Sequence, residues 1–180
     1  TDAHSGNYAA ELTTELVNNT MMVKVRIAAG SLFLGTFNAN NIMADPLSGP
    51  QFGIPYSGAL PERLQGWYKY QPGADNLDND GNALGKPDEC DIYAILYTGS
   101  VLTAKDVKDN SRIVAKARLK DRGAKGEWTK FDEEFVYYRE PKPGEELKFS
   151  IVMTSSVNGD SYSGAVGSRL VVDDVEVVLR

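Results

Sequence analysis

The chain has 180 residues, 42% of them hydrophobic and 24% charged, which is typical of a soluble globular protein large enough for one sizeable core. Its formal charge of −6 argues against a nucleic-acid partner, which would need a basic face. A single cysteine, Cys90, excludes an intramolecular disulfide, and a single histidine, His4, argues against a Cys2His2 zinc site or a Cys–His catalytic pair. No apolar run approaches the roughly 20 residues needed to span a bilayer.

The first third of the chain is predicted to form short strands separated by turns. Alternating apolar residues indicate strands over 8–14, 23–27 and 31–37. Residues 38–50 are rich in Asn, Asp-Pro and Ser-Gly-Pro and are therefore predicted to be a loop.

The next strand, over 63–71, has two unlike faces because successive side chains point to opposite sides. The face expected to be buried carries Leu64, Gly66, Tyr68 and Tyr70. The polar face carries Arg63, Gln65, Trp67 and Lys69. An indole on a polar face is unusual, and an acidic loop follows over 75–91.

The remaining strands are predicted over 91–97, 112–120, 128–138, 147–153 and 170–179. In the second of these, Arg112, Lys116, Arg118 and Lys120 should form a solvated charge ladder opposite Asp132 and Glu134. With about eight to ten short strands and no amphipathic helix of useful length, the fold is predicted to be all-β. We expect an antiparallel β-sandwich of the jelly-roll type, with residues 1–180 as one domain.

Several stretches carry a resemblance to known families. The opening His-Ser-Gly-Asn-Tyr-Ala-Ala (4–10) and the closing Ser-Arg-Leu-Val-Val-Asp-Asp-Val (168–175) resemble jelly-roll carbohydrate-binding modules. Gly-Trp-Tyr-Lys-Tyr (66–70), Lys-Pro-Asp-Glu-Cys-Asp-Ile-Tyr (86–93) and Gly-Ala-Val-Gly-Ser (164–168) resemble the putative carbohydrate metabolism domain, found in surface proteins of polysaccharide-degrading bacteria. The resemblance implies a piece of a longer secreted or surface protein. It would act outside the cell, at the outer-membrane surface or in the periplasm.

A saccharide partner fits the polar face around Trp67. Flat aromatic rings bury the C–H faces of sugars, and polar neighbours bind the hydroxyl groups. Candidate ligand-binding residues are therefore Trp67, Lys69, Gln65 and Arg63, with Tyr93 and Tyr97 as a possible extension. Trp67 could instead cap a sheet edge or pack under the 38–50 loop, and Trp128 fits core or rim packing better than ligand contact.

Two acidic pairs could bind a structural calcium ion. Asp78 and Asp80 lie in an Asn-Leu-Asp-Asn-Asp-Gly stretch that begins like a calcium loop, although it lacks the terminal glutamate of an EF-hand. By resemblance to jelly-roll modules, Asp173 or Asp174 could bind calcium together with a group near the N-terminus such as Asp2.

We therefore expect a non-catalytic carbohydrate-binding module for an oligo- or polysaccharide, with other surface proteins of a glycan-binding complex as further candidate partners. One alternative is a glycoside hydrolase that uses a carboxylate pair drawn from Asp88, Glu89 and Asp91, or from the acidic run 132–134. Another is a structural or adhesive β-sandwich, in which the resemblance reports the fold only.

Overall fold

The structure is a computed structural model that describes residues 2–17, 25–40, 45–108 and 110–180. These residues form strands β1 to β17 and short 3-10 helices η1 to η4, and no α-helix occurs among them. Every strand pair in this part of the chain is antiparallel. The prediction of an all-β antiparallel fold is therefore confirmed. Residues 23 and 24 of the predicted second strand lie outside the described residues.

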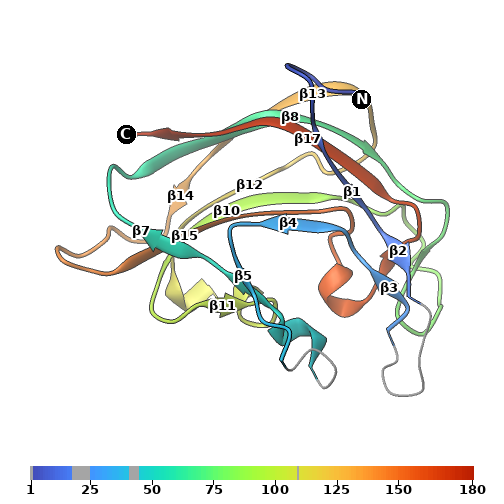
Figure 1. Cartoon of the computed structure of the whole chain (residues 1–180), viewed down its shortest axis with the longest axis horizontal. Coiled ribbons are helices and arrows are strands. Elements are labelled where there is room, and N and C mark those ends of the chain that lie inside the picture. Colours follow the sequence, from blue (N-terminus) through green and yellow to red (C-terminus); the bar gives the residue numbers. More distant parts are fainter. Residues whose placement is uncertain (1, 18–24, 41–44, 109) are drawn as a thin grey trace.

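The first large sheet has four strands in the order β1-β17-β8-β13. They are β1 (Ala10–Thr13), β17 (Arg169–Leu179), β8 (Pro61–Gln71) and β13 (Lys125–Glu134). β8 lies between β17 and β13, so it is a central strand rather than an edge (Figure 1).

The second large sheet has six strands and packs against the first (Figure 1). Five follow the order β14-β12-β10-β15-β4, and β7 also pairs with β15. They are β14 (Val136–Tyr137), β12 (Ile113–Arg118), β10 (Asp91–Thr98), β15 (Leu147–Thr154), β4 (Ser31–Phe33) and β7 (Ile54–Tyr56).

Smaller elements surround the two large sheets. Three short strands pair as β11-β6-β5: β5 (Gly35–Phe37), β6 (Pro50–Phe52) and β11 (Leu102–Thr103). Two further pairs are β9 (Asn76–Leu77) with β16 (Gly164–Ala165) and β2 (Glu15–Leu16) with β3 (Ile27–Ala28). The 3-10 helices are η1 (Pro46–Ser48), η2 (Asp106–Lys108), η3 (Asn110–Arg112) and η4 (Gly159–Ser161).

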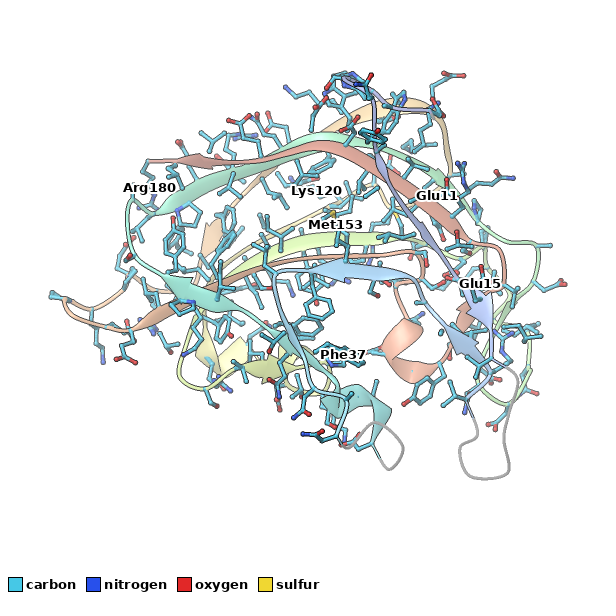
Figure 2. All side chains as sticks on the ribbon, in the orientation of Figure 1. Glu11, Glu15, Phe37, Lys120, Met153 and Arg180 are labelled. Carbon is cyan, nitrogen blue, oxygen red and sulfur yellow. The ribbon has the colours of Figure 1, made fainter. Side chains whose placement is uncertain are left out.

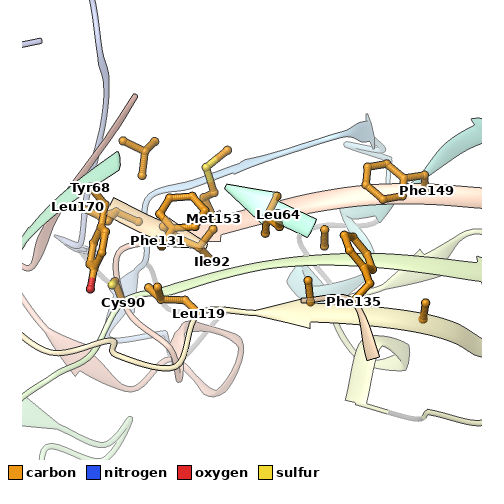
Figure 3. Packing of buried hydrophobic residues seen from close by; sticks show 14 of the residues in the cluster. Leu64, Tyr68, Cys90, Ile92, Leu119, Phe131, Phe135, Phe149, Met153 and Leu170 are labelled. Carbon is orange, nitrogen blue, oxygen red and sulfur yellow. The ribbon is translucent and has the colours of Figure 1, made fainter. Parts of the chain in front are cut away.

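The main hydrophobic core lies between the two large sheets, as Figure 3 shows. The first sheet contributes, among others, Leu64, Tyr68, Phe131 and Leu170, and the second contributes Ile92, Phe149 and Met153. Burial of each such side chain contributes about 1.5–3 kcal/mol, so this layer is the main source of stability.

The alternation predicted for β8 is confirmed. Its four inward positions are buried and its four outward positions are half-buried, in the strict order that a period of two requires. The inward tyrosines keep hydrogen bonds: the hydroxyl of Tyr68 donates to the carbonyl of Asp121, and that of Tyr70 to the carbonyl of Ser155.

β10 is buried on both faces, because each face has its own cluster. Ile92, Ala94 and Leu96 belong to the main core. Tyr93, Ile95 and Tyr97 belong to a second cluster on the outer face of the six-stranded sheet, which includes Phe52 of β6 and Leu102 of β11.

The predicted charge ladder is wrong, because β12 pairs with β10 and β14 and not with β13. Arg118 instead lies opposite Tyr93 and binds Asp91. Asp132 of β13 pairs with Arg63 of β8, its antiparallel neighbour. A register shift after Leu96 also moves Ile113, predicted to point inward with Ala115, into the second cluster.

The loop between β14 and β15 gives a prediction for the acid range. The guanidinium of Arg139 binds both oxygens of Glu145, and the backbone N–H of Lys142 adds a third bond. Arg139 first, and then the Lys142 N–H, lower the pKa of Glu145 from 4.5 to about 2. The folded chain thus binds this proton more weakly than the unfolded chain. The resulting stabilisation is complete above pH 4.5 and is lost as the pH falls towards 2.

We therefore expect Glu145→Gln to lower the free energy of unfolding above about pH 5 by a constant amount, and the difference from wild type to vanish near pH 2. Urea titrations across this range would measure it. Glu146→Gln is the matched control, because Glu146 is exposed and no basic group of the described residues lies within ion-pair distance. A Glu145→Gln deficit that does not change with pH would contradict the expectation.

Candidate functional site

A cleft of about 720 Å³ opens on the outer face of the six-stranded sheet, away from β8 and the main core. Strands β10, β12 and β15 form its floor, and β3, β4, β5 and the 156–162 segment supply its walls. Figure 2 shows Phe37 on the side of the sheet that faces away from β8. Phe37 lines this cleft and is 60% exposed, so it is one of the exposed large hydrophobic residues.

Asp91 and Arg118 form a fixed ion pair on the cleft floor. The Nε of Arg118 lies 3.0 Å from Oδ1 of Asp91, and its Nη2 lies 2.8 Å from Oδ2. The Asp91 side chain is only 5% exposed, whereas that of Arg118 is 43% exposed. Hydrogen bonding to Asp91 raises the pKa of Arg118. Two parallel bonds hold the guanidinium plane in one orientation, with part of it exposed to a ligand.

Tyr93 and Lys116 lie beside this pair on the same face of the sheet. The Nζ of Lys116 is 5.2 Å from the centre of the Tyr93 ring, within the range of a cation–π contact. Burial, and then the charge of Arg118, lower the pKa of Lys116. Burial raises the pKa of Tyr93, so its hydroxyl stays protonated at neutral pH. The floor therefore combines an aromatic ring with two cations.

A second carboxylate, Glu89, lines the cleft near Arg122 and Lys86. Its Oε2 lies 3.5 Å from Nη2 of Arg122 and 4.0 Å from Nζ of Lys86. Glu89 and Asp91 are thus the two members of the predicted carboxylate group that reach the cleft.

Asp88, the third member of that group, has a structural role instead. Its carboxylate is buried, and its Oδ2 accepts bonds from the hydroxyl groups of Ser156 and Ser168 and from the backbone N–H of Ala165. Its Oδ1 accepts the backbone N–H of Glu89. Asp88 is therefore not available to a saccharide, and its proposed place in a catalytic pair is wrong.

The acidic run 132–134 does not reach the cleft either. Asp132 and Glu134 flank Arg63 on the first sheet, with oxygen–nitrogen distances of 2.5 and 3.6 Å. Glu133 lies 3.0 Å from Nζ of Lys120. These carboxylates form ion pairs at the other sheet.

The indole of Trp67 points away from the core, as β8 requires, but the N-terminal segment covers it. The His4 ring stacks on the indole with a centroid separation of 4.0 Å and an interplanar angle of 15°. Trp128 meets the His4 ring edge-on at 5.8 Å, and Lys69 lies over Trp128 at 5.3 Å while binding Asp2. Trp67 therefore does not cap a sheet edge, because β8 is a central strand, and its ring lies under the N-terminal segment rather than under the described part of the 38–50 loop. The surface around Trp67 is a second candidate saccharide site, but the His4 ring already covers one face of the indole.

The comparisons with known proteins fit a carbohydrate-related domain. Residues 1–178 match the family described as the putative carbohydrate metabolism domain. The chain belongs to this family.

Two crystal structures are similar to this member of the putative carbohydrate metabolism domain family. One, described as a putative glycoside hydrolase from Bacteroides thetaiotaomicron, has 33% identity and a TM-score of 0.92, over 99% of this chain and 55% of that chain. The other, described as a putative glycoside hydrolase from Bacteroides vulgatus, has 32% identity and a TM-score of 0.85, over 96% of this chain and 73% of that chain. The domain thus spans about half the length of the first structure. No curated protein sequence matches it.

The predicted extension of the Trp67 surface by Tyr93 and Tyr97 is wrong. Both tyrosines lie on β10, on the other sheet and on the far side of the main core. They do share one face, as predicted, but only Tyr93 lines the cleft. Tyr97 is fully buried, and its hydroxyl donates to the carbonyl of Phe52. A Cβ at Gly53 (φ +116°) would collide with the Tyr97 ring, so a glycine is required there.

The first predicted calcium pair lies in a self-contained turn. Asp78 accepts the backbone N–H groups of Asp80 and Asn82 and the side-chain amide of Asn82. These bonds lower the pKa of Asp78, the Asn82 amide contributing most. Asp80 is exposed. The Asp78 carboxylate is thus bound within its own turn, with Oδ1 accepting two hydrogen bonds and Oδ2 accepting one.

The second predicted calcium pair holds the N-terminal segment. Asp173 accepts the backbone N–H groups of His4 (2.9 Å) and Ser5 (3.2 Å). Asp174 binds Nδ1 of His4 (2.7 Å) and the hydroxyl of Ser5 (2.6 Å), and its φ of +50° marks a bulge in β17. Asp2 pairs with Lys69 rather than with either aspartate.

Among the described residues, no group of three or more His, Cys, Asp or Glu side chains is arranged to hold a metal ion. Calcium binding by either pair stays a prediction. The residues that sequence reasoning missed are Lys116, Arg118 and Phe37, which share the cleft with Tyr93. The sequence does hold a signal for them. Lys116 and Arg118 lie on one face of a predicted strand, and this face could pair with the strand of Asp91 and Tyr93 as well as with β13.

Proposed function

We propose that this domain is a non-catalytic carbohydrate-binding module that holds a saccharide in the cleft on the outer face of the six-stranded sheet. The observation that carries the proposal is the cleft floor itself, where Tyr93, Lys116 and the Arg118–Asp91 pair lie side by side. Membership of the putative carbohydrate metabolism domain family, and likeness to two proteins described as glycoside hydrolases, support a carbohydrate as the ligand class.

The chemistry of the cleft suits a sugar. Phe37, which is 60% exposed, offers rigid apolar surface for C–H groups, and Arg118 offers charged N–H donors for hydroxyl groups. Tyr93 is nearly buried in the floor and supports Lys116 from below. A volume of about 720 Å³ is within the range of small-molecule sites and could enclose a short oligosaccharide. The Trp67 surface lacks these features because His4 already occupies one face of the indole.

Binding is favoured over hydrolysis because Arg118 already holds both oxygens of Asp91. A glycosidase needs one carboxyl group free to donate a proton and a second to act as base or nucleophile. A hydrolase remains the second candidate, because Glu89 also lines the cleft and both similar crystal structures are described as glycoside hydrolases. The hydrolase would be favoured if the domain released reducing sugar and if both Glu89→Gln and Asp91→Asn abolished this release.

The wider setting is part of the same proposal. We infer a jelly-roll topology, supported by the way the chain passes repeatedly between the two large sheets from β8 to β17. We also propose that the domain belongs to a longer secreted or surface protein, since it spans only part of the structures it resembles. No helix of the described residues is long and apolar enough to cross a membrane.

Replacing Phe37 tests the site directly. We expect Phe37→Ala to weaken binding of the best ligand on a glycan array about tenfold, because an exposed ring that stacks on a sugar is removed. Tyr8→Ala is the matched control, because Tyr8 is 81% exposed and does not line the cleft. Titration calorimetry would measure both.

Two results would overturn the proposal. The array could stay blank, which would leave a structural or adhesive role. Alternatively, Trp67→Ala could abolish binding while Phe37→Ala leaves it unchanged, which would place the ligand on the first sheet.

A further inference from the structure

Lys116 is the basic side chain of the cleft that has no acidic partner among the described residues. Arg118 pairs with Asp91, and Arg122 and Lys86 both approach Glu89. For Lys116, no carboxylate of the described residues lies within 4 Å of Nζ.

The surroundings of this ammonium group make the absence of a counter-ion unfavourable. Its Nζ lies over the Tyr93 ring, and Arg118 lies on the same face of β12. Burial and then the like charge of Arg118 disfavour the cation more than the charge of Asp91 favours it, so the pKa of Lys116 is lowered. A strongly hydrated side chain such as lysine is rarely kept in such a place without a partner. A bound anion would supply one.

The charge balance of the cleft points the same way. Among the described residues, its lining includes four basic side chains and three acidic ones, whereas the whole chain carries a formal charge of −6. The four are Lys86, Lys116, Arg118 and Arg122, and the three are Glu89, Asp91 and Asp160. A net positive patch in an acidic protein attracts an anionic ligand.

We infer that the saccharide bound in the cleft carries an anionic group, a uronate carboxylate or a sulfate ester, and that Lys116 pairs with it. The Nη1 of Arg118 makes no hydrogen bond to the described residues, so this guanidinium can add a second charged donor. The inference rests on the proposed function, since it names the ligand class of the same cleft.

The first experiment compares matched ligands. The wild-type domain would be titrated with oligogalacturonate and its methyl ester, and with dextran sulfate and neutral dextran. We expect binding to at least one charged member of these pairs, about tenfold or more tighter than to its neutral counterpart and weakened by added salt. Which charged member binds distinguishes a carboxylate from a sulfate ligand.

The second experiment identifies the residue. We expect Lys116→Met to remove most of the preference for the charged member, so that the affinities for the charged and the neutral member become nearly equal, because methionine keeps the apolar contact with Tyr93 but not the charge. Lys116→Arg should restore most of the preference. Lys120→Met is the matched control, since Lys120 is a strongly exposed lysine that pairs with Glu133 outside the cleft.

The outcomes separate the two proposals. A wild-type domain that binds neutral saccharides in the cleft as tightly as charged ones would overturn this inference and leave the proposed function intact. So would a Lys116→Met variant, folded by circular dichroism, that keeps the full preference for the charged ligand. A domain that binds no saccharide on a glycan array would remove the proposed function, and this inference with it.

Discussion

Asp88→Ala is expected to lower the free energy of unfolding by about 3–5 kcal/mol, the range for breaking a buried charged group away from its partners. The carboxylate is 2% exposed and accepts hydrogen bonds from two hydroxyl groups and two backbone N–H groups. These donors come from three separate stretches, before β10, after β15 and around β16. Removal of the acceptor leaves buried donors without a partner, which is the costly case.

Guanidinium chloride titration at neutral pH would measure the loss. Asp75→Ala is the control, because Asp75 is an exposed loop aspartate, and it should change stability by less than about 0.5 kcal/mol. Asp88→Asn keeps the shape and one acceptor oxygen but turns an amide donor towards these N–H and O–H groups. Its loss of unfolding free energy should lie between the losses of Asp88→Ala and Asp75→Ala. A stable Asp88→Ala variant that had lost only a catalytic activity would restore Asp88 to the candidate active site.

Arg118→Met is expected to have the second largest effect, and it acts on both stability and binding. The variant leaves the nearly buried carboxylate of Asp91 without its bidentate partner. We expect a loss of about 2 kcal/mol, less than for a fully buried pair because solvent reaches Arg118. Saccharide affinity should fall about tenfold or more, because the charged donors on the floor are lost.

A double variant separates these two effects. Arg118→Met with Asp91→Leu removes both charges, so most of the lost stability should return. Its saccharide affinity should stay low, since the donors are still absent. Denaturant titration and calorimetry on the same samples would measure both quantities. A double variant that recovers stability and also binds like wild type would show that the pair supports the fold only.

The alternation of β8 could be predicted from the sequence because it depends on strand geometry alone. Leu64, Tyr68 and Tyr70 enter the core and Trp67 does not, in agreement with a period of two. The surroundings of β10 are less predictable from the sequence. Its two apolar faces serve two different clusters, so the pattern indicates a buried strand but not what lies on each side.

Strand partners and loop contacts could not be read from local patterns. Lys116 and Arg118 were equally compatible with β13 and β10, and only the sheet order places them beside Asp91. The environment of Trp67 depends on His4, far away in the sequence. The opening and closing stretches that carried the family resemblance bind each other, through Ser5 and Asp174 among others. Each of the two motifs therefore supplies hydrogen-bond partners for the other.

The most direct measurement is a crystal structure of the domain soaked with the saccharide that binds most tightly on a glycan array. We expect sugar density in the cleft against Phe37, with Lys116 and Arg118 in hydrogen-bonding contact and the His4–Trp67 stack unchanged. Density on the indole of Trp67, with His4 displaced and the cleft empty of sugar, would contradict the assignment of the site.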